Sequence, residues 1–296
     1  MPRSPKNHLP NYPLFEHPLF EQFLPELGWG PDFAAVARGL RRHGCAVVDF
    51  PHADFDMLSK GIVERLSGEV MGPDAKVKQP GVKDAWQSDK GVKEIATSPS
   101  ILNLLHVVFG RKPFPFQTQN YAVGTQQTLR SDAVHFNSRP ERFLCGVWVA
   151  LEDAEEDNGP LHYYPGTHSW PIYTTDQLGV DVSAQEHAPN QAPYEPFWSD
   201  RVKAERIEPQ AFYAKKGQAL IYAANLLHGD TPRVDTARTR WSQLTRYYFD
   251  DCAYWAPLAS NTGMGHTQYR RPVNILTGKP VQNTYLGKPI LKPSKR

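Results

Sequence analysis

The segment Gly159-Pro160-Leu161-His162-Tyr163-Tyr164-Pro165-Gly166-Thr167-His168 combines a glycine–proline turn, a short aromatic stretch and a Pro-Gly-Thr-His corner. Further along the chain, Leu227-His228-Gly229-Asp230 ends a largely apolar stretch at residues 218–227. Short apolar or aromatic runs that are bounded by glycine and proline are typical of β-strands. Both segments therefore predict strands that end in tight turns, with His228 at a strand end.

The composition describes a globular chain of 296 residues with 33 basic and 31 acidic residues. Because no block of basic residues or basic aromatic stripe stands out, we expect no nucleic-acid partner. The three cysteines, Cys45, Cys145 and Cys252, are widely spaced, which favours neither disulfides nor structural zinc and fits a reducing cytoplasm. We also expect no signal peptide and no transmembrane helix. The sequence does not indicate an oligomeric state.

Apolar periodicity predicts helices before strands. Helices are expected from Asp32 as N-cap to Gly44, over residues 54–67, and from Ser98 to Gly110. From Phe114 onward the apolar residues recur at every second position, which is the spacing of a β-strand. The expected strands are 116–123, 128–136, 143–151, 161–164, 210–213, 218–224 and 241–249, and residues 45–50 form an earlier one. This order indicates an α+β, mainly β fold with an antiparallel core.

The chain divides into three expected parts. Residues 1–30 are interrupted by prolines and predict an irregular arm, residues 31–250 form the main domain, and residues 251–296 form a C-terminal extension. Within the domain, residues 171–208 are polar and contain proline, so they predict an insertion of the kind that serves as a lid or substrate loop.

These motifs resemble those of the phytanoyl-CoA dioxygenase (PhyH)-like family of Fe(II)/2-oxoglutarate-dependent oxygenases. The resemblance extends over roughly residues 33–250 and includes the Trp-bearing strand Cys145-Gly146-Val147-Trp148-Val149-Ala150-Leu151-Glu152. It implies a double-stranded β-helix (jelly roll, cupin-like) with N-terminal helices packed on it. It also implies Fe(II) held by two histidines and one carboxylate, a set that leaves three positions open for 2-oxoglutarate and O₂.

The resemblance assigns His228 as a metal ligand, because it occupies the position of the family's distal histidine. Arg240 and Ser242 lie beyond it and resemble the Arg-x-Ser pair that binds the distal carboxylate of 2-oxoglutarate. A guanidinium suits this role because its geometry matches a carboxylate. Arg238 and Arg246 are competing candidates, and strand parity does not separate Arg238 from Arg240.

The other ligands belong to a His-x-Asp pair, for which two registers compete. His135-Phe136-Asn137 would retain the histidine and replace the aspartate by Asn137. Counting back from Trp148 instead places the pair on Arg130-Ser131-Asp132, which retains the carboxylate and replaces the histidine by arginine. We favour this second register.

In the favoured register Arg130 cannot ligate iron, because a guanidinium stays protonated and has no lone pair. On a strand, Arg130 and Asp132 would share a face and pair with each other. His135 becomes a ligand only if a bulge or turn reorients it, and it is the candidate replacement. Asn120 and Gln127 precede these residues, where similar enzymes place side chains that contact 2-oxoglutarate.

Two functions follow from these residues. The first is an Fe(II)/2-oxoglutarate-dependent dioxygenase of the hydroxylase type that acts on a small metabolite, with Asp132, His228 and His135 as candidate ligands. The second is a non-redox relative that binds a small acidic metabolite through Arg130 and Arg240, or uses Arg130 as a catalytic residue in a metal-free step. The sequence does not specify the substrate.

Overall fold

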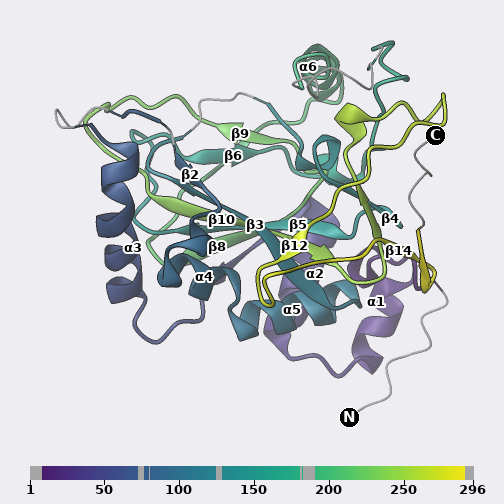
Figure 1. The fold of residues 1–296 in the computed structure, drawn as a ribbon, viewed down its shortest axis with the longest axis horizontal. Coiled ribbons are helices and arrows are strands. Elements are labelled where there is room, and N and C mark those ends of the chain that lie inside the picture. Colours follow the sequence, from purple (N-terminus) through teal and green to yellow (C-terminus); the bar gives the residue numbers. More distant parts are fainter. Residues whose placement is uncertain are drawn as a thin grey trace.

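The computed structural model describes residues 9–72, 77–79, 81–124, 129–180, 182 and 191–290. At its centre is a six-stranded antiparallel sheet with the strand order β1-β8-β5-β10-β3-β2 (Figure 1). Strand β5 is buried at every position because both faces of the sheet are covered. The strands are β1 (Cys45–Asp49), β2 (Gly81–Lys83), β3 (Pro113–Tyr121), β5 (Leu144–Ala150), β8 (Gln218–Ala223) and β10 (Ser242–Phe249).

Helices cover one face of this sheet, and Figure 1 shows α2, α4 and α5 below it. Their apolar sides and the facing strand residues form the largest buried cluster of the protein. Gly44 and Gly110, at φ angles of 81° and 75°, end α2 and α5 in the left-handed conformation that glycine adopts readily. The helices are α1 (Phe20–Phe23), α2 (Pro31–His43), α3 (Phe55–Val70), α4 (Lys90–Ala96) and α5 (Pro99–Phe109).

A three-stranded sheet of order β7-β6-β9 lies over the opposite face. It consists of β6 (Leu161–Tyr163), β7 (Gln210–Phe212) and β9 (His228–Asp230). Trp148 of β5 contacts Phe212 of β7 with ring centroids 5.7 Å apart, and the two sheets enclose a second apolar cluster. The polar residues at one end of this cluster form the site described below.

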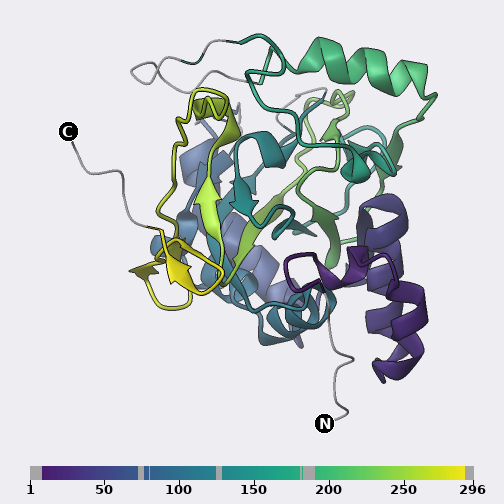
Figure 2. The ribbon, with the colours of Figure 1, turned by 90° about the vertical axis from the view of Figure 1, so that its right-hand side faces the viewer.

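The remaining elements of the described chain are a helix and three separate two-stranded sheets. Helix α6 (Glu195–Ala204) packs Trp198 against Trp170 and Leu258, and β4 (Asn137–Arg139) pairs with β11 (Ala253–Trp255). Figure 2 shows α6 at the top of the molecule, with the C-terminal segment and the N-terminal helices on opposite sides. That segment forms two small hairpins, from β12 (Val273–Asn274) with β13 (Lys279–Pro280), and β14 (Thr284–Tyr285) with β15 (Lys288–Pro289).

The structure bears out most of the expected elements and corrects several. The three predicted helices and the antiparallel arrangement are confirmed, but α2 has Gly30 as its N-cap and Asp32 in its first turn. The expected strand 128–136 is wrong: residues 125–128 lie outside the described residues, and Asp132–Val134 form a 3₁₀ turn. Helix α4 was not anticipated. The long strand before His228 ends at Ala223, and a turn separates it from β9.

The N-terminal residues contribute to the core. Phe15 and Phe20 are fully buried among the residues of α2 and α5. Among the described residues, no helix combines the length and the apolar character needed to cross a membrane.

Close packing between β5 and β8 gives a direct test of this arrangement. A Cβ added at Gly146 would overlap the ring of Tyr222 on the neighbouring strand. We expect Gly146→Ala to lower the free energy of unfolding by about 1–3 kcal/mol, as overpacked cores do. Gly68→Ala is the matched control, because nothing lies within 4 Å of its added Cβ. In the helix α3 that change should stabilise by about 0.5–1 kcal/mol. Urea unfolding of both variants measures the difference, and equal effects would contradict the packing.

Candidate functional site

Two short segments bring the polar residues of the interior together. Arg130 lies directly opposite His228, with backbone hydrogen bonds of 2.8 and 3.0 Å in the two directions. His228 and Asp230 share one face of β9, because alternate residues of a strand point to the same side. Across the interior, Ser242, Leu244 and Arg246 share the inward face of β10, where Leu244 belongs to the inter-sheet cluster.

The Pro-Gly-Thr-His corner positions His228. The Thr167 hydroxyl accepts a 3.0 Å hydrogen bond from the Leu227 amide, and the Tyr164 amide donates to the Leu227 carbonyl at 2.9 Å. The corner therefore fixes the backbone immediately before His228. The two sequence motifs are therefore in direct contact in the structure.

Asp132 forms a buried ion pair with Arg246. Its Oδ1 accepts from Arg246 Nη2 at 2.8 Å, and its Oδ2 accepts from Arg246 Nε at 2.9 Å and from the Tyr222 hydroxyl at 2.9 Å. Burial alone would raise the pKa of Asp132, but the charge and hydrogen bonds of Arg246 outweigh it and hold this pKa well below its usual range. Both carboxylate oxygens are thus engaged within the protein.

Asp230 joins two further arginines. Its Oδ2 accepts from Arg130 Nη1 at 3.0 Å, and its Oδ1 accepts from Arg240 Nη2 at 3.0 Å. Arg240 is 1% exposed and its guanidinium lies 5.2 Å from the centre of the Trp148 ring. Its Nε and Nη1 groups are buried and have no acceptor among the described residues. We refer to Arg130, Asp132, Asp230, Arg240 and Arg246 together as the charge network.

His228 is held as a neutral imidazole within this network. Burial, reinforced by the charge of Arg130, lowers the pKa of His228 to about 4. Its Nδ1 lies 2.9 Å from the Leu226 carbonyl, which can only accept, so Nδ1 carries the proton. The Nε2 lone pair is buried and has no partner in the described part of the chain.

The structure separates the predicted site residues into two groups. Arg130, Asp132, His228, Arg240 and Ser242 converge on the interior. The remaining candidates lie elsewhere. Asn120 is on the opposite face of β3, where its amide donates to Gln243 and Gln243 in turn bonds to α4. Gln127 lies outside the described residues, and Arg238 forms ion pairs with Glu155 and Asp157.

His135 follows the 3₁₀ turn directly and is its C-cap residue. Burial is the main cause that lowers the pKa of His135. Arg246 and Arg270 lower it further, whereas Asp132 and a hydrogen bond with Gln191 raise it. Asn137, from the alternative register, belongs to β4 and pairs with Trp255 in a separate sheet. It is therefore Arg130 that lies opposite His228, and not Asn137.

The expected contact between Arg130 and Asp132 is wrong. Arg130 pairs with Asp230, and Asp132 pairs with Arg246. The expectation assumed a regular strand, but the chain turns after Ser131, whose hydroxyl accepts from the Ala133 amide. The turn directs Asp132 toward Tyr222 and β10.

Sequence reasoning missed Asp230, Tyr222 and the role of Arg246. Two of them could have been identified from the alternation of side chains along a strand. Asp230 is two residues from His228, and Arg246 is an even number of residues from Arg240 and Ser242, so each would point to the same face as these residues. Tyr222 carried no such signal, because its position depends on the pairing of β8 with β5.

An iron site of the family type requires three protein ligands, and the described residues of the interior do not provide them. His228 Nε2 is available, but both oxygens of Asp132 already accept hydrogen bonds and the first histidine position holds Arg130. The described ranges contain no group of three His, Cys, Asp or Glu side chains that could hold a metal ion. The residues present therefore do not fit Fe(II) in this arrangement.

Comparison with known proteins identifies the family. Residues 42–240 match the family described as phytanoyl-CoA dioxygenase (PhyH), which is more than half of the chain, so the protein belongs to this family. It is 32% identical over 81 residues to phytanoyl-CoA dioxygenase domain-containing protein 1 of Danio rerio, a match covering 26% of this chain and 28% of that protein. The matched segments span less than half the length of the curated relatives.

Two solved structures share the fold. SnoN, described as a non-heme alpha ketoglutarate dependent epimerase from nogalamycin biosynthesis, aligns with a TM-score of 0.57 at 19% identity. The alignment covers 85% of this chain and 96% of SnoN. EctD from S. alaskensis, crystallised with bound Fe, aligns with a TM-score of 0.56 at 19% identity, covering 75% of this chain and 79% of EctD.

The Asp132–Arg246 pair predicts strong coupling between the two residues. Arg246→Met leaves the Asp132 carboxylate buried without its main partner, which should cost about 3–5 kcal/mol of unfolding free energy. Adding Asp132→Asn to this variant removes the stranded charge and should recover part of the loss. Urea unfolding of the two single variants and the double variant measures the coupling, which we expect at about 1–3 kcal/mol. Strictly additive effects would contradict the ion pair.

His168 of the corner predicts acid sensitivity. Burial, with the nearby charge of Arg142, lowers the pKa of His168 to about 4. Between pH 6.5 and 4 the unfolded chain takes up a proton that the folded protein does not, so stability falls as the pH falls. His168→Gln should flatten this slope by up to about 1.4 kcal/mol per pH unit. The pH dependence of stability that remains in the variant includes the contribution of His228, whose pKa is also lowered by burial. Urea unfolding at several pH values tests this, and an unchanged slope in the variant would refute it.

Proposed function

We propose that this protein is a non-redox member of the phytanoyl-CoA dioxygenase family that binds a small anionic metabolite through the arginines of the charge network. We further propose that its two facing sheets form a double-stranded β-helix, whose interior holds this network. The observation that carries the functional proposal is the engagement of Asp132 by Arg246 and Tyr222, together with Arg130 opposite His228.

The charge balance of the interior supports an anionic ligand. Three arginines of the charge network face two aspartates, and His228 is neutral because its pKa lies near 4. Glu152, the other acid near Arg240, is half-buried and accepts the Trp241 amide at 2.6 Å. A buried charge without a partner is costly, so an additional negative charge would stabilise this interior.

The unpartnered groups of Arg240 specify the chemistry of that anion. Nε and Nη1 are donors only, both are buried, and neither has an acceptor among the described residues. A carboxylate supplies such oxygens and also the missing charge, and its hydrogen bonds with a guanidinium are stronger than neutral ones. With a bound monocarboxylate, the three arginines of the charge network would face three negative charges, those of Asp132, Asp230 and the ligand.

In this proposal each residue has a binding role. Arg240 and Arg130 supply positive charge to the ligand, and Asp230 holds the two guanidiniums in place. Asp132 and Tyr222 fix Arg246, which closes the other side of the interior. His228 contributes a neutral acceptor at Nε2, to which a protonated group of the ligand could donate.

A second candidate function is an Fe(II)/2-oxoglutarate-dependent dioxygenase that hydroxylates a small metabolite. Family membership and the buried Nε2 of His228 favour it. It requires Arg246 to leave Asp132, and it requires a replacement for the histidine that Arg130 displaces. The present arrangement of the charge network opposes both changes.

Anaerobic titration with Fe(II) in the presence of 2-oxoglutarate separates the two functions. We expect no stoichiometric binding, and no release of succinate after O₂ is admitted to the titrated sample, because two candidate ligands and a guanidinium do not form a tight site. His228→Ala should therefore leave the weak binding isotherm unchanged. Tight one-to-one binding that His228→Ala abolishes would refute the non-redox proposal and support the dioxygenase.

A further inference from the structure

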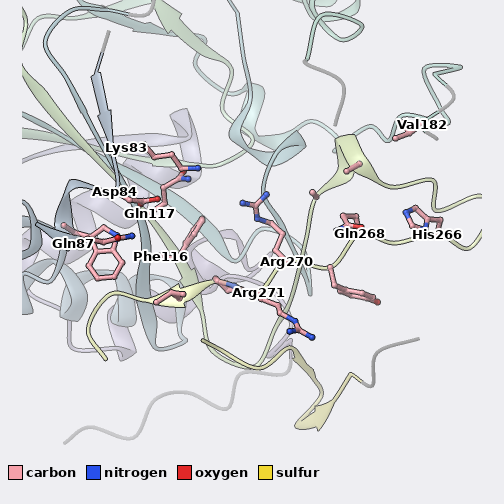
Figure 3. Close-up of a pocket in the computed structure, with 16 residues that line it drawn as sticks. Lys83, Asp84, Gln87, Phe116, Gln117, Val182, His266, Gln268, Arg270 and Arg271 are labelled. Atoms are coloured by element: carbon pink, nitrogen blue, oxygen red, sulfur yellow. The ribbon is translucent and has the colours of Figure 1, made fainter. Parts of the chain in front are cut away.

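A cavity beside the charge network is bounded by two distant parts of the chain. Residues of β2 and β3 with the turn that follows β2 form one wall, and the segment from Ala256 to Val273 forms the other. Figure 3 shows Lys83, Gln117 and Phe116 on one side, and Arg270, Arg271 and Gln268 on the other. Its volume of about 630 Å³ is within the range of small-molecule sites.

Positive charge dominates the cavity. Lys83, Arg270 and Arg271 line it, and none of them forms an ion pair with a carboxylate in the described structure. Asp84 is the single acidic residue among the described residues of the lining, and its Oδ1 accepts the Thr118 amide at 3.1 Å. Three cations against one acid favour an anionic ligand.

Aromatic side chains provide flat apolar walls. Phe116 is fixed by stacking on Tyr248, with ring centroids 4.1 Å apart, and Trp86 and Tyr269 line the same cavity. The Trp86 Nε1 group is buried and has no acceptor among the described residues. A planar ligand with acceptor oxygens would contact these rings and satisfy this donor.

Gln117 connects the cavity to the charge network. It lines the cavity, and its Oε1 accepts from Arg246 Nη1 at 2.9 Å. Arg246 and Arg270 lie on the same ring of Phe136, at 5.1 and 4.4 Å from its centroid. The positive potential of the interior therefore continues into the cavity.

We propose that this cavity binds an organic anion with a planar, aromatic body and a carboxylate group. The ring lies against Phe116 and Trp86, and the carboxylate interacts with Lys83, Arg270 and Arg271. The inference goes beyond the proposed function, because no residue of the charge network lines this cavity, and it adds a second anion site with a named ligand class.

Binding of 2-naphthoate to the full-length protein tests this inference, measured by isothermal titration calorimetry and by quenching of tryptophan fluorescence. We expect one-to-one binding that weakens as salt is added, because the rim charges are exposed to solvent. Naphthalene-2-methanol, which has the same ring without the charge, should bind at least tenfold more weakly. Equal affinity for the two compounds would overturn the proposal.

Substitutions at the cavity locate the binding. Lys83→Gln and Arg271→Gln change exposed side chains, so both variants should fold normally and lose about tenfold in affinity, which corresponds to about 1.4 kcal/mol. Lys90→Gln, an exposed lysine on α4 outside the lining, is the matched control and should bind as the unmodified protein does. Trp86→Phe should reduce the fluorescence quenching.

The outcomes distinguish this inference from the proposed function. Absence of naphthoate binding, or binding that neither Lys83→Gln nor Arg271→Gln weakens, overturns the cavity assignment and leaves the iron titration unaffected. Tight iron binding together with cavity-dependent naphthoate binding would refute the non-redox proposal while the cavity assignment stands.

Discussion

The ion pair between Asp132 and Arg246 is the interaction on which the arrangement of the interior depends. It crosses from the 3₁₀ turn to β10 and thereby closes the space between the two segments. Burying a charge pair costs desolvation energy that is recovered only when the groups are fully hydrogen-bonded. The Asp132 carboxylate meets this condition with three hydrogen bonds, from Arg246 twice and from Tyr222 once. Both oxygens of this carboxylate are therefore held by donors of the protein itself.

The second half of the charge network follows the same principle. Asp230 is shared by Arg130 and Arg240, so two guanidiniums are ordered around one carboxylate. Together with Arg246, these two guanidiniums leave the interior with a net positive charge. Gln117 accepts from Arg246 and also lines the cationic cavity, so it connects the two regions. Membership of the phytanoyl-CoA dioxygenase family thus describes the scaffold, whereas the charges of this chain favour anion binding as its proposed function.

The sequence predicted the elements whose signals are local. Apolar periodicity located α2, α3 and α5, and the glycines after α2 and α5 ended them as expected. Helix α4 was missed because it is short and carries no long apolar stripe. The strand expected at 128–136 was wrong because a 3₁₀ turn, stabilised by the Ser131 hydroxyl and by the contacts of Asp132, replaces its second half.

The site was predictable only in part, for a related reason. Motif spacing brought attention to Asp132, His228 and Arg240, and the structure places all three at the interior. Which arginine pairs with which aspartate depends on strand register and on the turn after Ser131, and neither is visible in a single sequence. Tyr222 illustrates the limit, since its hydroxyl meets Asp132 only through the pairing of β8 with β5.

A crystal structure of the protein grown without oxygen, in the presence of Mn(II) and 2-oxoglutarate, tests the central claim most directly. The account predicts that Arg246 remains on both oxygens of Asp132, and that no metal lies between Asp132 and His228 Nε2. A metal ion coordinated by these two side chains, with Arg246 turned away from Asp132, would contradict it.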